Sequence, residues 1–271
     1  MAISNFIESV WSAALLEPFK SAQYLVPAVN HQYEGELASG NTVKVTAITT
    51  PTIQNYATGR VLTIDALADT TQSLVINKED AISFKVDDVD RVQSAGSFEP
   101  VTRDAAKALA ENAETNLLAD LKTNGTSAGT AAITTPALAF AAVVAIRTAL
   151  VKAKVPSSDR ILAVSPEFAA LLLGEASKLT TADIAGDGEL RNGVLGKLLG
   201  FTVIEHPLLT HTSSRPCAVG LHGPSVGYVG QIQKVEAGRM ELAFADYVRA
   251  LNVYGTKVLR PTAVQTYLPA S

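Results

Sequence analysis

Residues 99–122 carry apolar side chains at a helical spacing without interruption. The apolar residues recur at every fourth position: Val101, Ala105, Leu109, Ala113, Leu117 and Leu121. This spacing places them along one face of an α-helix. Pro100 suits a first helical turn, and Asn124-Gly125 ends the pattern. Much of the apolar face is alanine, so we expect another element to pack closely along this helix of about 35 Å.

Before this helix the pattern changes to short strands. Between residues 40 and 88 the segments TVKVTAI, VLTI, SLVI and ISFKV are rich in β-branched residues and are separated by polar turns. Two strands of this region would form a ribbon of about 35–50 Å. A lone two-stranded ribbon is marginally stable in water. Unless the strands fold back into a compact sheet, the ribbon needs a neighbouring subunit to lie on.

Residues 4–20 carry a second, shorter helical pattern. Its apolar positions are Phe6, Ile7, Val10, Trp11, Ala14, Leu15 and Phe19. The pattern fits an arm that docks elsewhere and equally a helix that packs on its own domain. No basic residues precede the apolar run, and Glu8 and Glu17 interrupt it, so we do not expect a signal peptide.

The rest of the chain predicts a compact α/β unit followed by long strands. After a Gly/Ser/Thr-rich linker at 124–135, helical patterns at 136–155 and from Pro166 alternate with strands at 161–165, 201–207 and 217–221. The last fifty residues return to strand, interrupted by Gly255 and by Pro261, which disfavours a central strand position. We expect these strands to pair beside the long helix. The fold class is therefore α+β.

Composition excludes several classes of protein. The net charge of −4 and the absence of basic runs argue against a dedicated nucleic-acid binder. No apolar run reaches 18 residues, so no membrane partner is expected. The single cysteine, Cys217, excludes an intrachain disulfide. Hydrophobic residues make up 47% of the chain and charged residues only 18%, so apolar surface must enter a core or subunit contacts.

One motif suggests catalysis. Residues 223–227 fit the G-x-S-x-G pattern of a hydrolase, which would use Ser225, Asp246 and a histidine. That motif needs a strand, a tight turn and a helix, with its histidine downstream. Here the following residues have a strand pattern, and no histidine follows His222. We predict instead a glycine-rich loop between two strands, and hence no catalytic residues.

No metal or cofactor site is expected. The acidic cluster at 87–90 lacks the glycine and the distal glutamate of a calcium loop, so it is more typical of a solvated turn or an ion-pair partner of Arg91 or Arg103. His206 and His211 are five residues apart across a proline, which is no metal-ligand spacing. The glycines between 186 and 200 match no nucleotide-binding pattern.

The segment GELRNGVLGKLLGFTVIEHP, residues 188–207, resembles a motif of tailed-bacteriophage major capsid proteins with the HK97-like fold. The positions that fill the motif are Gly193, Val194, Gly196, Leu198, Gly200, Phe201, Val203 and Ile204. The segments FIESVWSAALLEPF and VDDVD resemble the same family, and the resemblance covers essentially the whole chain. It implies an N-terminal arm (1–38), an extended β-hairpin called the E-loop with its flanking strands (39–88), a peripheral domain with a long spine helix (89–130), an axial domain (131–223) and return strands of the peripheral domain (224–271).

The resemblance also implies a structural function. The subunit would assemble through pentamers and hexamers into an icosahedral shell around packaged double-stranded DNA, in a virion assembled in the bacterial cytoplasm. A separate scaffolding protein and a portal are the expected partners. An encapsulin-type nanocompartment shell is the alternative. Intersubunit contacts are expected on the arm, on the E-loop and on an axial loop at 177–192, at Trp11, Phe19, Ile53, Tyr56, Arg60, Asp183 and Arg191.

Overall fold

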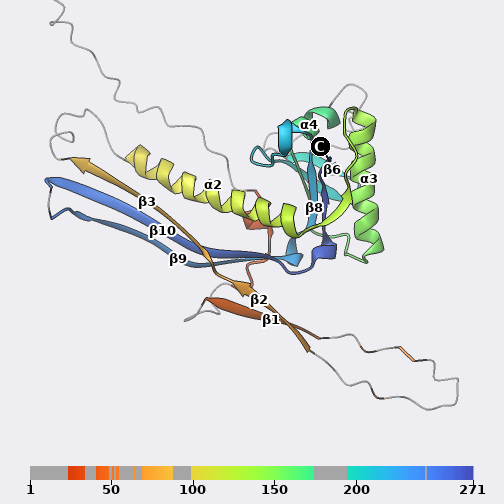
Figure 1. Ribbon diagram of the computed structural model, residues 1–271, viewed down its shortest axis with the longest axis horizontal. Helices are drawn as coiled ribbons and strands as arrows, with labels where there is room; N and C mark the ends of the chain where they lie inside the picture. Colours follow the sequence, from red (N-terminus) through yellow and green to blue (C-terminus); the bar gives the residue numbers. More distant parts are fainter. Residues whose placement is uncertain are drawn as a thin grey trace, which may run out of the picture.

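The predicted long helix is α2, Glu99–Asn124, and the other elements are arranged around it (Figure 1). The computed structural model describes residues 24–33, 41–48, 51, 53, 54, 64, 69–87, 99–173, 194–241 and 243–270. At 1.5 Å per residue, α2 is about 39 Å long. Its first half lies along an elongated sheet, and its last turns reach a second, more compact region.

The elongated sheet has three antiparallel strands. The order is β3 (Lys78–Asp87), β10 (Ala245–Val258) and β9 (Val226–Arg239). The apolar stripe of α2 is deeply buried in its second half, at Ala113, Leu117 and Leu121, whereas Ala105 and Leu109 are half-buried. The expected close packing is therefore tightest where α2 meets the compact region.

The base of the predicted ribbon is a pair of antiparallel strands, β1 (Thr42–Ile48) and β2 (Asp69–Val75). It packs across the elongated sheet through a small apolar cluster that includes Leu74 and Val253. The sequence suggested that Gly255 interrupts the C-terminal strand. In the structure, Gly255 lies inside β10. A Cβ at this position would lie 2.5 Å from the Val75 carbonyl oxygen. Glycine is thus required because the two backbones cross there.

The compact region is built on a mixed sheet of six strands. Its order is β4 (Thr126–Gly129), β11 (Val264–Tyr267), β8 (Ala218–His222), β5 (Arg160–Val164), β7 (Phe201–Glu205) and β6 (Val194–Leu198). Helices α3 (Pro136–Lys152) and α4 (Pro166–Leu172) pack on one face through Leu162, Val164 and Phe201. The end of α2 packs on the other face, against Ala163 and Val219.

Three details of the strands add to the sequence interpretation. The short strands β4 and β11 both belong to the six-stranded sheet, although the predicted boundaries placed them in the peripheral domain. The long C-terminal strand is split by a 3-10 turn, Pro261–Ala263, as its proline indicated. The glycine-rich segment before β7 forms strand β6, which joins β7 through Leu199 and Gly200, both at positive φ. No helix among the described residues is both long and apolar enough to span a membrane.

Candidate assembly site at the base of the N-terminal arm

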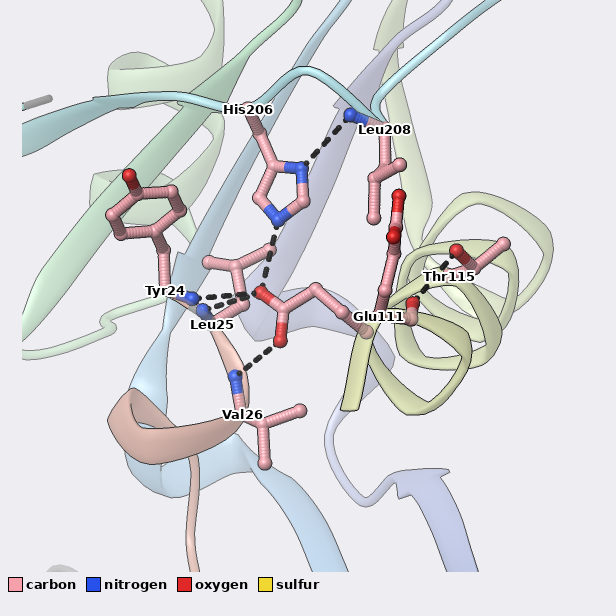
Figure 2. Close-up of polar contacts among 8 residues, drawn as sticks. Tyr24, Leu25, Val26, Glu111, Thr115, His206 and Leu208 are labelled. Carbon is pink, nitrogen blue, oxygen red and sulfur yellow. Dashed lines mark hydrogen bonds and ion pairs between the residues drawn. The ribbon is translucent and has the colours of Figure 1, made fainter. Parts of the chain in front are cut away.

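A buried carboxylate on α2 holds the start of the described chain. Glu114 is fully buried, and its Oε1 accepts hydrogen bonds from the backbone N–H groups of Tyr24 (3.1 Å) and Leu25 (2.6 Å). Its Oε2 accepts one from Val26 N–H at 3.2 Å. Figure 2 shows these amide groups converging on the carboxylate. Three consecutive N–H groups aimed at one anion form a built anion site at the base of the arm.

The fourth donor to Glu114 comes from the compact region. His206 follows β7 and is fully buried, and its Nε2 lies 2.9 Å from Glu114 Oε1. Its Nδ1 accepts a hydrogen bond from Leu208 N–H at 3.3 Å, so Nδ1 carries no proton. The neutral Nε2–H tautomer therefore satisfies both contacts. Glu114 thereby ties together the arm base, α2 and the compact region.

These donors decide the charge state of Glu114. Burial by itself would raise the pKa of this carboxyl, but the hydrogen bonds from His206 and from the Leu25 and Val26 amides outweigh it and lower the pKa. Glu114 is thus an ionised carboxylate in the interior, stabilised by four donors. Such a group is strongly destabilising once its donors are removed.

Apolar and aromatic packing completes the arm base. Leu25, Val26 and Val29 are buried in the same cluster as the second half of α2. Asn30 continues the contact as a strand-like bridge to β9, because its N–H donates to Val226 O (2.9 Å) and its carbonyl accepts from Tyr228 N–H (3.0 Å). The His31 ring lies 5.2 Å from that of Tyr228 between centroids. The arm base is therefore fixed to the subunit core along residues 24–31.

A second polar network joins α2 to the elongated sheet. The Tyr254 hydroxyl donates to Asp80 Oδ2 (2.8 Å) and accepts from Asn116 Nδ2 (2.6 Å). Asn112 Nδ2 donates to the same Asp80 oxygen at 2.7 Å. Burial and the hydrogen bond to Asp80 raise the pKa of Tyr254, and its ring stacks on Tyr228 at 5.6 Å. The network fixes the angle at which α2 crosses strands β3 and β10.

Most of the residues predicted to contact other subunits lie outside the described residues: Trp11, Phe19, Tyr56, Arg60, Asp183 and Arg191. Ile53 is described and is 98% exposed; Ile64, which precedes β2 in the chain, is 94% exposed. Sequence reasoning missed Glu114 and His206. The signal was present, because Glu114 lies beside Leu117 and Leu118 on the apolar stripe of the helix. An acidic residue at such a position indicates a buried partner.

The hydrolase arrangement is not assembled. Gly223–Ser225 is a 3-10 turn that leads into strand β9, as predicted, and Ser225 is only 4% exposed. Its hydroxyl lies 3.1 Å from His222 Nδ1. Asp246, however, is at the other end of the sheet, where it pairs with Arg239. It is twelve positions along β10 from Val258, the strand partner of Val226, a distance of about 40 Å.

The described residues also contain no group of three or more His, Cys, Asp or Glu side chains placed to hold a metal. His206 and His211 point to different partners, since His211 Nε2 donates to the Pro269 carbonyl at 2.9 Å. Of the acidic cluster, Asp87 lies at the end of β3 and residues 88–90 are outside the described residues. Cys217 is buried, and burial raises the pKa of its thiol to about 11.

Comparison with known proteins identifies the family. A family model described as phage capsid protein matches residues 70–267. No curated protein sequence matches the chain. A solved structure from Mycobacterium phage Che8 is 40% identical with a TM-score of 0.87, covering 98% of both chains. The capsid of the cyanophage P-SCSP1u is 15% identical (TM-score 0.82, covering 100% of this chain and 95% of that one). The mature capsid of bacteriophage PhiM1 is 14% identical (TM-score 0.72, covering 97% and 92%).

The matched family and the described architecture agree. The long helix beside an elongated sheet, the ribbon base and the compact region reproduce the HK97-like arrangement that the sequence resemblance implied. The match favours a phage capsid over an encapsulin-type shell. The chain therefore belongs to the phage capsid protein family and is a phage major capsid protein, a structural protein that self-assembles into the shell of the virion.

Proposed function

We propose that this subunit assembles through pentamers and hexamers into an icosahedral shell around packaged double-stranded DNA. The observation that carries the proposal is a contrast: the bases of the arm and of the ribbon are fixed to the subunit core, whereas described residues of the ribbon are exposed. The arm base is fixed at Glu114, and the ribbon base is fixed across β10 at Gly255. The ribbon residues Ile53 and Ile64 are almost completely exposed. Exposed apolar side chains on an extension of a rigid base favour contact with a neighbouring subunit.

The proposal assigns a role to each part of the subunit. Residues 1–38 would serve as arm, 39–88 as E-loop with its flanking strands, 89–130 with 224–271 as peripheral domain and 131–223 as axial domain, with β3 joining the elongated sheet and with β4 and β11 joining the axial sheet. Contacts between subunits would involve Ile53, Tyr56 and Arg60 on the E-loop. Trp11 and Phe19 would make contacts from the arm, and Asp183 and Arg191 would do so around the five-fold and six-fold centres.

The role towards DNA is enclosure without tight binding. The net charge of −4 supports this role, because tight binding of the phosphate backbone needs an excess of Lys and Arg. A separate scaffolding protein would guide shell closure, and a portal would occupy one vertex. The subunit would act without enzymatic chemistry, which the separation of Ser225 from Asp246 supports.

The proposal is tested by expressing the protein alone and with a candidate scaffolding protein, followed by nuclease treatment and electron microscopy. Closed shells of one size, with subunits in rings of five and six, are the expected result. Particles from infected cells should retain nuclease-protected double-stranded DNA. Particles that enclose only protein cargo would contradict the proposed role towards DNA.

A further inference from the structure

Helix α3 exposes an apolar seam on the side away from the six-stranded sheet. The seam residues are spaced four and three apart, and all are exposed: Ala137, Ala141, Val144, Thr148 and Val151. Val144 is 38% and Val151 51% exposed, and the adjoining Leu138 is 43% exposed. This spacing is that of the a and d positions through which one helix packs on another. The small side chains would allow a partner helix to approach closely.

The opposite side of α3 is already buried. Ala139, Ala142, Val143, Ile146 and Leu150 pack on the sheet. The helix is therefore apolar nearly all round, with Arg147 and Lys152 as its only charged residues. A helix of this kind is normally covered on all sides. The seam is a docking surface that the isolated subunit leaves open.

Charge indicates what kind of partner fits. Every charged residue from 136 to 158 is basic: Arg147, Lys152 and Lys154. Two α3 helices packed together would bring like charges beside one seam, which is unfavourable. An amphipathic helix that carries acidic residues and large apolar side chains would complement this surface in charge and in size.

The chain itself contains such a segment. Residues 4–20 have an apolar stripe at helical spacing that includes the large side chains of Phe6, Trp11 and Phe19, and Glu8 and Glu17 are their only charges before Lys20. The segment and α3 are both seventeen residues long. We propose that the α3 seam of one subunit binds residues 4–20 of a second copy. This inference rests on the proposed contacts of the arm with neighbouring subunits.

Geometry excludes the segment of the same subunit. Tyr24 is held at Glu114, on the face of the six-stranded sheet opposite to α3 (Figure 1). The chain from residue 20 to residue 24 spans at most about 14 Å. The α3 layer alone is about 10–12 Å thick, and the sheet lies beneath it. The segment of the same chain therefore cannot reach the outer side of α3.

Disulfide trapping in mixed particles tests the proposal. One variant carries Val144→Cys and a second carries Val10→Cys or Ala14→Cys; the buried Cys217 does not compete. A disulfide forms only when the two Cβ atoms come within about 4.5 Å, so we expect roughly tenfold more mixed dimer than with the exposed control Thr123→Cys on α2. The double change Arg147→Glu with Lys152→Glu should lower the yield of the mixed dimer, because it places acidic residues on both helices. Adding Glu8→Lys with Glu17→Lys should restore that yield.

The outcomes separate this inference from the proposed function. Particles that form with no cross-linking above the control overturn the α3 proposal and leave the shell proposal standing. Cross-linking of Val144→Cys to itself or to a different protein overturns it in favour of another occupant. A wild-type chain that forms no particles overturns both. If the cysteine variants fail to assemble, the test is the particle yield of the variants with exchanged charges at Arg147, Lys152, Glu8 and Glu17. If the Glu8→Lys and Glu17→Lys changes do not restore the particle yield, the proposal is contradicted.

Discussion

Replacing Glu114 tests whether one carboxylate fixes the base of the arm. Glu114→Ala removes the acceptor of three backbone N–H groups and of His206 Nε2–H at once. Each of these buried donors that is left without an acceptor costs about 1–3 kcal/mol. A domain of ordinary stability has about 5–15 kcal/mol in total, so the unassembled subunit should lose a large share of its free energy of unfolding.

Glu114→Gln separates the charge from the shape. The amide keeps one acceptor oxygen, but its NH₂ group must face either the Val26 N–H or the donors at Oε1. We expect a loss of about 1–3 kcal/mol, the penalty of leaving a buried donor unsatisfied. Thr115→Ala is the matched control, because Thr115 is the next residue on α2 and its exposed hydroxyl donates only to the Glu111 carbonyl. That change should stay within about 0.5 kcal/mol.

The assay is urea unfolding of the unassembled subunit, with hydrogen exchange of the amides of residues 24–26. Glu114→Ala should expose these three amides to rapid exchange while the amides of β5 remain protected. The lowered pKa of Glu114 adds a pH dependence. Its contribution to stability is fully present above the ordinary carboxyl pKa of 4.5 and is lost as the pH falls through the lower folded value. Unchanged exchange at residues 24–26 in Glu114→Ala would refute the assigned role.

Three further perturbations test other parts of the subunit. Gly255→Val should detach the base of the ribbon and cost about 1–3 kcal/mol by overpacking against Val75; a wild-type melting temperature with normal assembly would contradict this. Tyr254→Phe removes the hydrogen bonds to Asp80 and Asn116 and should cost about 1–2 kcal/mol in urea unfolding; an unchanged midpoint would show that water replaces the hydroxyl. Deleting residues 50–66 should leave folded subunits that sediment without forming particles; wild-type particles would show that the ribbon is not needed for assembly.

The sequence predicted those elements whose signals are local. The alanine and leucine stripe with Pro100 predicted the start of α2 and placed its end within two residues, and the apolar runs around Ile161 and Val219 are strands β5 and β8. The neighbours of an element depend on tertiary contacts, which local patterns do not contain. The segment TSAG of β4 has no strand pattern and becomes a strand because β11 pairs with it from the far end of the chain. Gly255 resembles a break locally, yet the crossing of β2 requires it.

The candidate site was less predictable for the same reason. The position of Glu114 on an apolar stripe indicates a buried partner, but the three amides that bind it are 88–90 residues away in the chain. The loop placement of His206 was correct, and its pairing with Glu114 could only come from the structure. Of the predicted intersubunit residues, the exposed Ile53 fits the expectation, and the contact itself stays a prediction.

The most direct measurement is cryo-electron microscopy of purified particles at a resolution that traces the chain. The proposed function predicts a closed shell with subunits in rings of five and six. Each E-loop should lie on a neighbouring subunit, and residues 24–31 should stay fixed at Glu114 of their own subunit. A monodisperse small particle, obtained both alone and with the scaffolding protein, would contradict it, as would an E-loop folded back on its own domain.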